Sequence, residues 1–124
     1  MAGSYVGWAL HPEDREALLE AFPPAYGKVV ADHVTLSLTS LMKGGLPTAR
    51  SGEVVGETDD GAGVQALVVR IEGTTDRPDG STYHLTWSLG PGRRAVESND
   101  VLRERGWTPI DPPRPIRLEP RRWP

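Results

Sequence analysis

Two six-residue segments of this chain nearly repeat each other, and each begins with a histidine. Residues 33–38 read HVTLSL and residues 84–89 read HLTWSL. Polar and apolar residues alternate strictly in both, which predicts a β-strand with one polar face and one apolar face. The polar face of each strand then carries an imidazole followed by two hydroxyl groups. Since the chain has only three histidines, this reuse marks two of them as the first residues to consider for chemistry.

Paired imidazoles with neighbouring hydroxyls fit acid–base chemistry on a phosphodiester. Hydrolysis of a cyclic phosphodiester needs a base that takes a proton from water and an acid that protonates the leaving oxygen. Imidazoles, with an ordinary pKa of about 6.5, hold these roles at neutral pH when one is neutral and the other charged. We therefore predict that His33 and His84 are the catalytic pair, with the assignment of acid and base left open. Thr35 and Thr86, one pleat further on, are predicted to donate hydrogen bonds to the non-bridging phosphate oxygens.

Further polar residues near the two segments are candidates for binding substrate. Ser37 and Ser88 extend the same strand faces and are predicted to line a polar groove rather than to catalyse. Three basic residues lie on the loops that follow the two segments: Lys43, Arg93 and Arg94. Contact with phosphate and simple exposure to solvent are about equally good interpretations of these three.

Metal binding is the weaker interpretation of the histidines. The chain has no cysteine, and a His-x-Thr pattern does not place two ligands side by side. The remaining histidine, His11, stands at a predicted helix start and fits a capping or surface role. Asp59 and Asp60 are most simply turn residues. The sequence therefore predicts neither a metal nor another cofactor.

Length and charge set limits on the class of protein. The 124 residues predict one domain over 1–124, and the net charge of −3 argues against general electrostatic binding to long nucleic acid. A small ligand or the terminus of an RNA remains compatible with that charge. No apolar run has the length of a membrane span, and the first residues lack the features of a signal peptide. We expect a soluble cytoplasmic protein without membrane contact.

The elements that must position the histidines follow from local patterns. A strand is predicted over residues 5–10, and then a helix that begins at Pro12, carries an apolar stripe and ends before residues 23–24. Residues 40–52 form a loop able to cover a site. Strands at 53–56 and 64–71 are joined by a hairpin turn at 59–63, and the second, apolar on both faces, is predicted to be central. Another turn at 76–80 precedes the second histidine segment.

After the second histidine segment, the chain is predicted to form a loop, a short helix and one edge strand. After the loop at 90–94 comes a short helix over about residues 99–105. Ser98 or Asn99 is its expected N-cap, which excludes both from the catalytic set. The Pro- and Arg-rich segment 111–124 is predicted to give one edge strand around residues 116–118 and then a tail.

The two histidine segments start about half the chain apart, and this spacing predicts the architecture. Each has other strands and one helix nearby, and no regular βαβ alternation is present. We predict an α+β fold with antiparallel sheets, few helices, and two similar lobes related by a pseudo-twofold axis. The histidine strands would meet in the groove between the lobes.

At His33-Val34-Thr35 and His84-Leu85-Thr86 the chain resembles the 2H phosphoesterase superfamily, named for two His-x-Thr/Ser motifs. The likeness is greatest to the cyclic phosphodiesterase domain of RNA-repair (tRNA) ligases, where a segment similar to residues 92–99 follows the second motif. The resemblance implies a bilobal α+β fold and a metal-independent site in the central cleft. It also implies hydrolysis of a 2′,3′-cyclic phosphate at an RNA end or in a small cyclic nucleotide.

Other functions stay open at this point. Some phage proteins of the same superfamily cleave cyclic oligonucleotide signals, and a non-catalytic domain of this fold would bind a nucleotide or an RNA end. An adaptor acting through residues 112–115 is a third possibility, although such Pro-rich ends are common. The sequence identifies neither the nucleotide, nor the bond broken, nor the oligomeric state.

Overall fold

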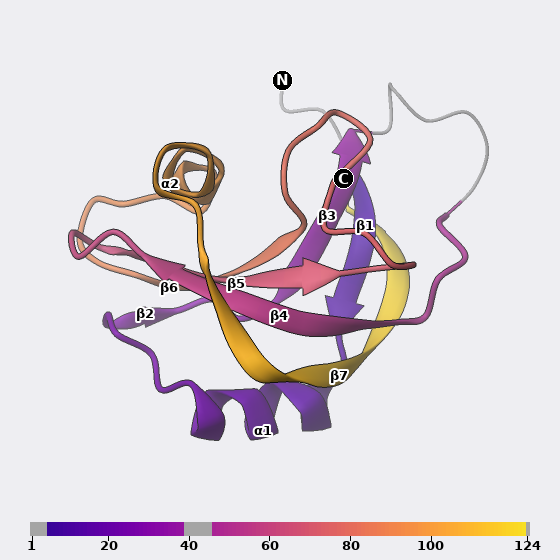
Figure 1. Cartoon of the computed structure of the whole chain (residues 1–124), viewed down its shortest axis with the longest axis horizontal. Helices are drawn as coiled ribbons and strands as arrows, with labels where there is room; N and C mark the ends of the chain where they lie inside the picture. Colours follow the sequence, from indigo (N-terminus) through magenta and orange to yellow (C-terminus); the bar gives the residue numbers. More distant parts are fainter. Residues whose placement is uncertain (1–4, 39–45, 124) are drawn as a thin grey trace.

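Six antiparallel strands close into a barrel. The structure is a computed structural model that describes residues 5–38 and 46–123, and within them the strand order is β6-β3-β1-β7-β4-β5, with β5 pairing back onto β6 (Figure 1). β2 lies outside this ring and pairs with β6. The elements in chain order are β1 (Tyr5–Leu10), α1 (Pro12–Ala21), β2 (Lys28–Val29), β3 (His33–Leu38), β4 (Ser51–Asp59), β5 (Val64–Arg70), β6 (His84–Leu89), α2 (Glu97–Arg105) and β7 (Thr108–Trp123).

The predicted α+β class and the antiparallel pairing are confirmed. Both histidine segments are strands over the predicted residues, and β5 is buried between β4 and β6. The arrangement in two lobes stays a prediction, because all the described strands belong to one sheet. Neither described helix has the length or apolar character needed to cross a membrane.

The apolar faces of the strands fill the barrel. Trp8, Val34, Leu85 and Trp87 belong to one core cluster, and each is at most 2% exposed. The Trp87 indole N–H donates to the carbonyl of Phe22 at 2.8 Å, so even its polar atom has a partner inside the fold. The period-two alternation therefore directs one face of each histidine strand inward and leaves its polar face outside the barrel.

Helix α1 covers one end of the barrel, at the bottom of Figure 1. Leu18 is 4% exposed and packs into the main core cluster. The predicted role of His11 is confirmed, because its Nδ1 accepts a hydrogen bond from the backbone N–H of Glu13 at the helix N-terminus. Asp14 forms hydrogen bonds with the backbone and side chain of Arg117 on β7, which attaches the helix to the sheet.

Helix α2 lies against the outer side of the barrel over β4, β5 and β6 (Figure 1). Leu102 packs with Val55 and Val68, while Val101 packs with Val64 and Leu89. These apolar contacts fix the helix beside the second histidine strand. The N-terminus of α2 therefore lies close to the outward face of β6.

The start of α2 corrects one sequence prediction. The helix begins at Glu97 and its N-cap residue is Val96, which forms no side-chain capping hydrogen bond. Ser98 and Asn99 therefore lie within the first turn rather than at the cap. The Glu97 carboxylate accepts a hydrogen bond from the backbone N–H of Arg94. The Ser98 hydroxyl caps no backbone N–H of the helix. Ser98 is fully buried, and its contact is with the second histidine strand, as described below.

The C-terminal segment also differs from the prediction. β7 is a continuous strand of 16 residues rather than an edge strand followed by a tail. Its first part, up to Arg117, pairs with β4, and its last part, from Leu118, pairs with β1. At each position only one side of β7 needs ladder hydrogen bonds, so prolines are tolerated much as on an edge strand. The unpaired stretch between Pro109 and Arg114 accommodates two more prolines.

Candidate active site

The two histidine motifs meet at one residue pair. Val34 of β3 and Leu85 of β6 are antiparallel partners, and each is the middle residue of its His-x-Thr motif. Both side chains are fully buried inside the barrel, so the residues on either side of them point outward. Because antiparallel strands run in opposite directions, His33 lies toward the Thr86 side of the pair and Thr35 toward the His84 side.

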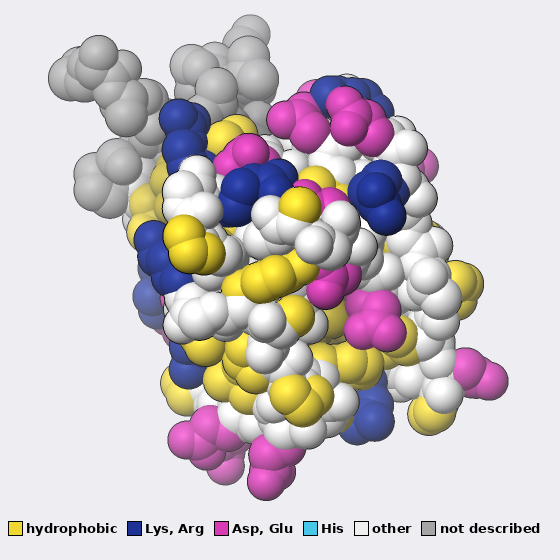
Figure 2. All heavy atoms as spheres, turned by 90° about the vertical axis from the view of Figure 1, so that its left-hand side faces the viewer, with side chains coloured by type: hydrophobic (Ala, Val, Ile, Leu, Met, Phe, Trp, Pro, Cys, Tyr) yellow, Lys and Arg dark blue, Asp and Glu magenta, His cyan; other side chains and the backbone are white. Residues whose placement is uncertain are grey.

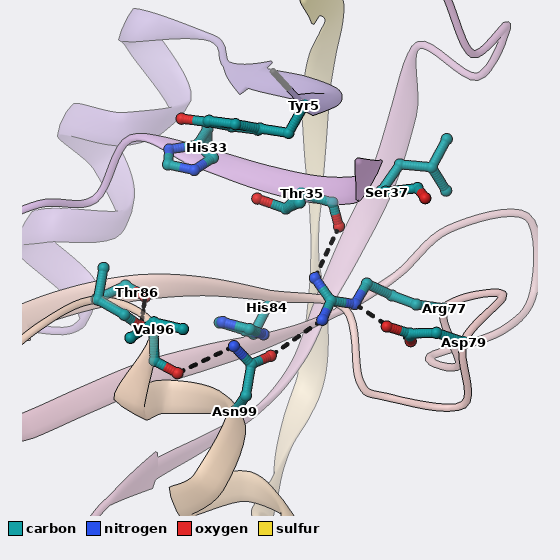
Figure 3. A pocket seen from close by; sticks show the side chains of 12 residues that line it. Tyr5, His33, Thr35, Ser37, Arg77, Asp79, His84, Thr86, Val96 and Asn99 are labelled. Carbon is teal, nitrogen blue, oxygen red and sulfur yellow. Dashed lines mark hydrogen bonds and ion pairs between the residues drawn. The ribbon is translucent and has the colours of Figure 1, made fainter. Parts of the chain in front are cut away.

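A pocket of about 470 Å³ lies over this pair, on the outside of the barrel. Its volume falls within the range of small-molecule binding sites. Five of the nine predicted site residues line it, and β1, the segment before β6 and α2 supply most of the rest (Figure 3). The lining residues are Tyr5, His33, Thr35, Leu36, Ser37, Arg77, Asp79, His84, Thr86, Ala95, Val96 and Asn99.

Gly7 brings β1 close enough to position the first motif. A Cβ atom at this residue would lie 2.1 Å from the carbonyl oxygen of Val34 and 3.0 Å from the Cα of Thr35. Both are backbone atoms, so any larger residue would push β1 away from the motif. The register between the two strands shifts at this point, between Val6 and Gly7. The first motif therefore depends on a glycine in the neighbouring strand.

Two aromatic rings surround the imidazole of His33. The ring centroids of Tyr5 and Trp123 lie 5.6 Å and 5.0 Å from that of His33, and the two rings stack on each other at 5.0 Å. The tyrosine and the tryptophan are partners across β1 and β7. Although core packing is the default for an aromatic residue, Tyr5 is only partly buried and lines the pocket. The rings restrict the orientation of His33.

His33 keeps some solvent contact and has an acidic neighbour. Its side chain is 24% exposed, and Nδ1 lies 3.6 Å from a carboxylate oxygen of Asp32. This distance is too long for a hydrogen bond, and Nδ1 is buried without a hydrogen-bond partner among the described residues. Burial lowers the pKa of His33 below its ordinary value, and the charge of Asp32 partly opposes that shift.

His84 is held more tightly. It is 9% exposed, and its Nδ1 lies 2.8 Å from the carbonyl oxygen of Thr82. A carbonyl only accepts, so in the neutral ring the proton is on Nδ1 and Nε2 carries the lone pair. Burial is the main cause that lowers the pKa of His84 to about 4, the positive charge of Arg77 acts in the same direction, and the hydrogen bond to Thr82 opposes both. The ring is therefore neutral at pH 7.

The two threonines differ as the histidines do, because the residue on β6 has more hydrogen-bond partners than the residue on β3. The Thr86 hydroxyl lies 2.9 Å from the hydroxyl of Ser98, in the first turn of α2, and 3.3 Å from the carbonyl oxygen of Ala95, just before the helix. Within the described part of the chain, no hydrogen-bond partner is found for the Thr35 hydroxyl. The Thr35 hydroxyl can therefore donate to a ligand directly, whereas the Thr86 hydroxyl must first give up its hydrogen bonds to Ser98 and Ala95. Ser98 is a polar group that the sequence assigned to a cap instead.

Three of the described substrate-binding candidates do not line the pocket: Ser88, Arg93 and Arg94. Ser88 is fully buried, and its hydroxyl donates a hydrogen bond to the Gln65 side chain and accepts one from the backbone N–H of Tyr26. The strand face was predicted correctly, but the chain before β2 covers its far end. Arg93 is bound instead by Asp60 and Glu97, at 2.9 Å and 3.0 Å.

Of the two remaining basic candidates, only Arg94 is described, and it does not line the pocket. Arg94 is exposed, and its backbone N–H donates to Glu97. Lys43 lies outside the described residues. Of the two interpretations left open for Arg93 and Arg94, neither residue lines the pocket that holds the two motifs.

Arg77 is the basic residue that the sequence reasoning missed. It lies in the segment between β5 and β6, which the pattern predicts only as a turn, yet its side chain is 11% exposed and lines the pocket. Nη2 donates to the Asn99 side chain at 3.0 Å and Nη1 to the Thr35 carbonyl at 3.4 Å (Figure 3). No spacing rule predicts that a turn arginine points inward, so only the tertiary structure reveals it.

The surface beside the pocket has no single sign of charge. On the face that includes α2, positive and negative side chains are interspersed in the upper part and hydrophobic side chains gather in the lower half (Figure 2). Glu97 and Asp100 in the first turn of α2 are balanced by Arg103 and Arg105 in its last turn. This face therefore lacks the continuous basic surface that long nucleic acids require.

Comparisons with protein-family models, with curated proteins and with solved structures found no significant match. Among the described residues, no three side chains of the types that commonly bind metals come together as a ligand set. The chemical content of the site is therefore two imidazoles, two threonine hydroxyls and one guanidinium around a small pocket. These groups are the basis of the functional proposal.

Proposed function

We propose that this protein hydrolyses 2′,3′-cyclic phosphates through acid–base catalysis by His33 and His84. The observation that carries the proposal is the pairing of Val34 with Leu85, the middle residues of the two motifs. This pairing relates the motifs by a local twofold axis, so that each strand supplies one imidazole and one hydroxyl to the same space. A phosphate centred there has a histidine on each of two sides.

The surroundings of the histidines support different roles for them. His84 has Nδ1 bound to the Thr82 carbonyl and is neutral, so its Nε2 accepts a proton from water. His33 has the Asp32 carboxylate 3.6 Å from Nδ1, which favours the imidazolium form that donates a proton. We therefore assign His84 as the general base and His33 as the general acid.

The reaction adds one water molecule and breaks one phosphorus–oxygen bond. Water loses a proton to His84 and its oxygen bonds to phosphorus, while the bond from phosphorus to one ribose oxygen breaks. That oxygen takes the proton from His33, and the product is a phosphomonoester. Negative charge grows on the non-bridging oxygens, where the hydroxyls of Thr35 and Thr86 donate hydrogen bonds.

The 2H-type architecture is part of the same proposal. The twofold relation between β3 and β6 is what a fold with two related lobes would produce at its centre. The pocket volume of about 470 Å³ favours a small cyclic nucleotide or a single RNA end over an extended strand. Cleavage of cyclic oligonucleotides and binding without catalysis are outcomes that the experiment below separates.

The test is incubation of the purified protein with a panel of nucleotides, followed by chromatography. The panel contains 2′,3′-cyclic mononucleotides, 3′,5′-cyclic mononucleotides, and cyclic di- and trinucleotides. We expect turnover of the 2′,3′-cyclic compounds and formation of a single phosphomonoester isomer from each. Turnover of the cyclic oligonucleotides alone would replace the proposed substrate class. No turnover of any compound, together with measurable binding, would favour a binding module.

A further inference from the structure

We infer that Arg77 forms an anion-binding subsite for the phosphate group of the ligand, next to Thr35 and His84. The inference rests on the proposed function and adds a residue that neither motif contains. Among the described residues that line the pocket, Arg77 is the only lysine or arginine. Figure 3 shows its guanidinium between the two histidine strands, near the His84 ring.

Three elements hold the guanidinium in place. Nε donates to the Ser81 hydroxyl at 2.5 Å, in the segment that leads into β6. Nη1 donates to the Thr35 carbonyl on β3, and Nη2 donates to the Asn99 side chain on α2. These hydrogen bonds span a seam at which β3 and β6 share one assigned residue pair. Arg77 is therefore positioned by the fold before any ligand arrives.

The hydrogen bonds leave donors for a ligand. A guanidinium has five N–H groups, and the three hydrogen bonds above use one on each nitrogen. One N–H therefore remains on Nη1 and one on Nη2, and these two groups can donate to phosphate oxygens. Asp79 is the nearby carboxylate, but its oxygen lies 3.8 Å from Nε, and its side chain is 60% exposed.

The electrostatics of the pocket favour the same assignment. Burial lowers the pKa of both histidines, so both rings are neutral at pH 7 in the ligand-free protein. A phosphate anion that enters the pocket loses hydration and needs a positive charge in return. Arg77 supplies that charge permanently, and the bound anion then favours protonation of His33.

The experiment compares the binding of adenosine 2′-monophosphate and of uncharged adenosine by isothermal titration calorimetry. We expect Arg77→Gln to weaken binding of the monophosphate at least tenfold and to leave adenosine within about twofold, because a charged hydrogen bond is lost. Arg77→Lys, which keeps the charge and loses the fork, should fall between. Arg70→Gln is the matched control, since Arg70 forms two hydrogen bonds with Glu53 outside the pocket.

A second measurement tests whether Arg77 places its positive charge at the pocket. NMR titration of the His84 ring should show a higher pKa in Arg77→Gln than in the wild type, because a neighbouring positive charge is removed, and no change in Arg70→Gln. If Arg77→Gln fails to fold, the Arg77 Nε–H signal of the wild type, assigned from Arg77→Lys, should shift when inorganic phosphate is added.

The outcomes keep this inference separate from the proposed function. Unchanged monophosphate affinity in Arg77→Gln, or an equal loss for adenosine, would overturn the anion subsite even if the wild type hydrolyses cyclic phosphates. An Arg77 signal that ignores phosphate would overturn it as well. Binding that depends on Arg77 without any turnover would support the subsite and contradict the phosphodiesterase.

Discussion

The two histidine strands have nearly the same sequence and very different surroundings. All six residues of β6 are buried, beneath α2 on one side and around the barrel core on the other. In β3, His33 is 24% exposed, and Thr35 and Ser37 are partly exposed at the open side of the pocket. The comparison teaches that a repeated motif does not imply repeated roles. Burial keeps the His84 ring neutral, while the Asp32 carboxylate favours the charged form of His33, and the base and acid roles we propose for them follow from that difference.

The largest expected effect comes from removing either imidazole. His33→Ala and His84→Ala should each lower kcat by roughly 10²- to 10⁴-fold, the usual contribution of a general acid or base. Steady-state kinetics on a 2′,3′-cyclic mononucleotide measure this, with circular dichroism to check the fold. His11→Ala is the matched control, because that ring only caps α1, and it should keep full activity. Wild-type kcat in either of the first two variants would remove that histidine from the chemistry.

A second prediction concerns stability against pH, where the two histidines should differ. The folded pKa of His84 is about 4, below the 6.5 of an unfolded histidine, so the unfolded chain binds the proton more readily. The free energy of unfolding should therefore fall as the pH drops from 6.5 to 4, by about 3 kcal/mol from this residue.

Urea unfolding at several pH values measures that loss. His84→Gln should flatten the dependence strongly, while His33→Gln should flatten it less because its ring is more exposed. Equal slopes in the wild type and in His84→Gln would show that the ring is not buried as described.

The threonines should separate by a smaller amount. Thr86→Val removes a buried hydroxyl that contacts Ser98 and Ala95, and it should cost about 1 kcal/mol of stability. Thr35→Val should leave the free energy of unfolding within about 0.5 kcal/mol, since a partly exposed hydroxyl is replaced. Both variants should lower kcat/KM. A larger stability loss in Thr35→Val than in Thr86→Val would contradict the difference between the strands.

The smallest expected effect is a shift in the pH profile. With His84 as base and His33 as acid, log kcat/KM should rise with pH through about 4 and fall through the lowered pKa of His33, giving an optimum below pH 6.5. Asp32→Asn removes the charge that raises the His33 pKa. The alkaline limb alone should then move to lower pH, by less than about one unit. Movement of the acid limb instead would exchange the two roles.

Local patterns predicted the elements of this fold better than their assembly. The alternation of 33–38 and 84–89 gave both histidine strands, and proline with acidic residues gave the start of α1. The closure of the barrel is different, because β3 and β6 meet through one assigned residue pair that no local pattern encodes. The length of β7 was missed because prolines normally argue against a long strand. They are tolerated here because the first part of β7 pairs only with β4 and the last part only with β1, so each position has one strand edge without a ladder partner.

The candidate site was predicted where it depends on strand faces and missed where it depends on long-range packing. The alternation correctly placed the histidines and threonines together. It also placed Ser88 on the same face, but Gln65 and the chain before β2 cover that end. Arg77 was missed because the direction of a turn side chain is decided by its partners. Those partners lie on β3 and α2, distant in sequence.

The most direct test of the paired-histidine account is ³¹P NMR of 2′,3′-cyclic AMP mixed with the protein in ¹⁸O-labelled water containing EDTA. We predict that the wild type converts the cyclic phosphate signal into that of one phosphomonoester carrying a single ¹⁸O atom. His33→Ala and His84→Ala should leave the cyclic signal unchanged over the same time. An unchanged cyclic signal with the wild type would contradict metal-independent hydrolysis by the two histidines. Conversion that occurs in a parallel sample without EDTA and not in the sample with EDTA would show that the reaction needs a metal ion.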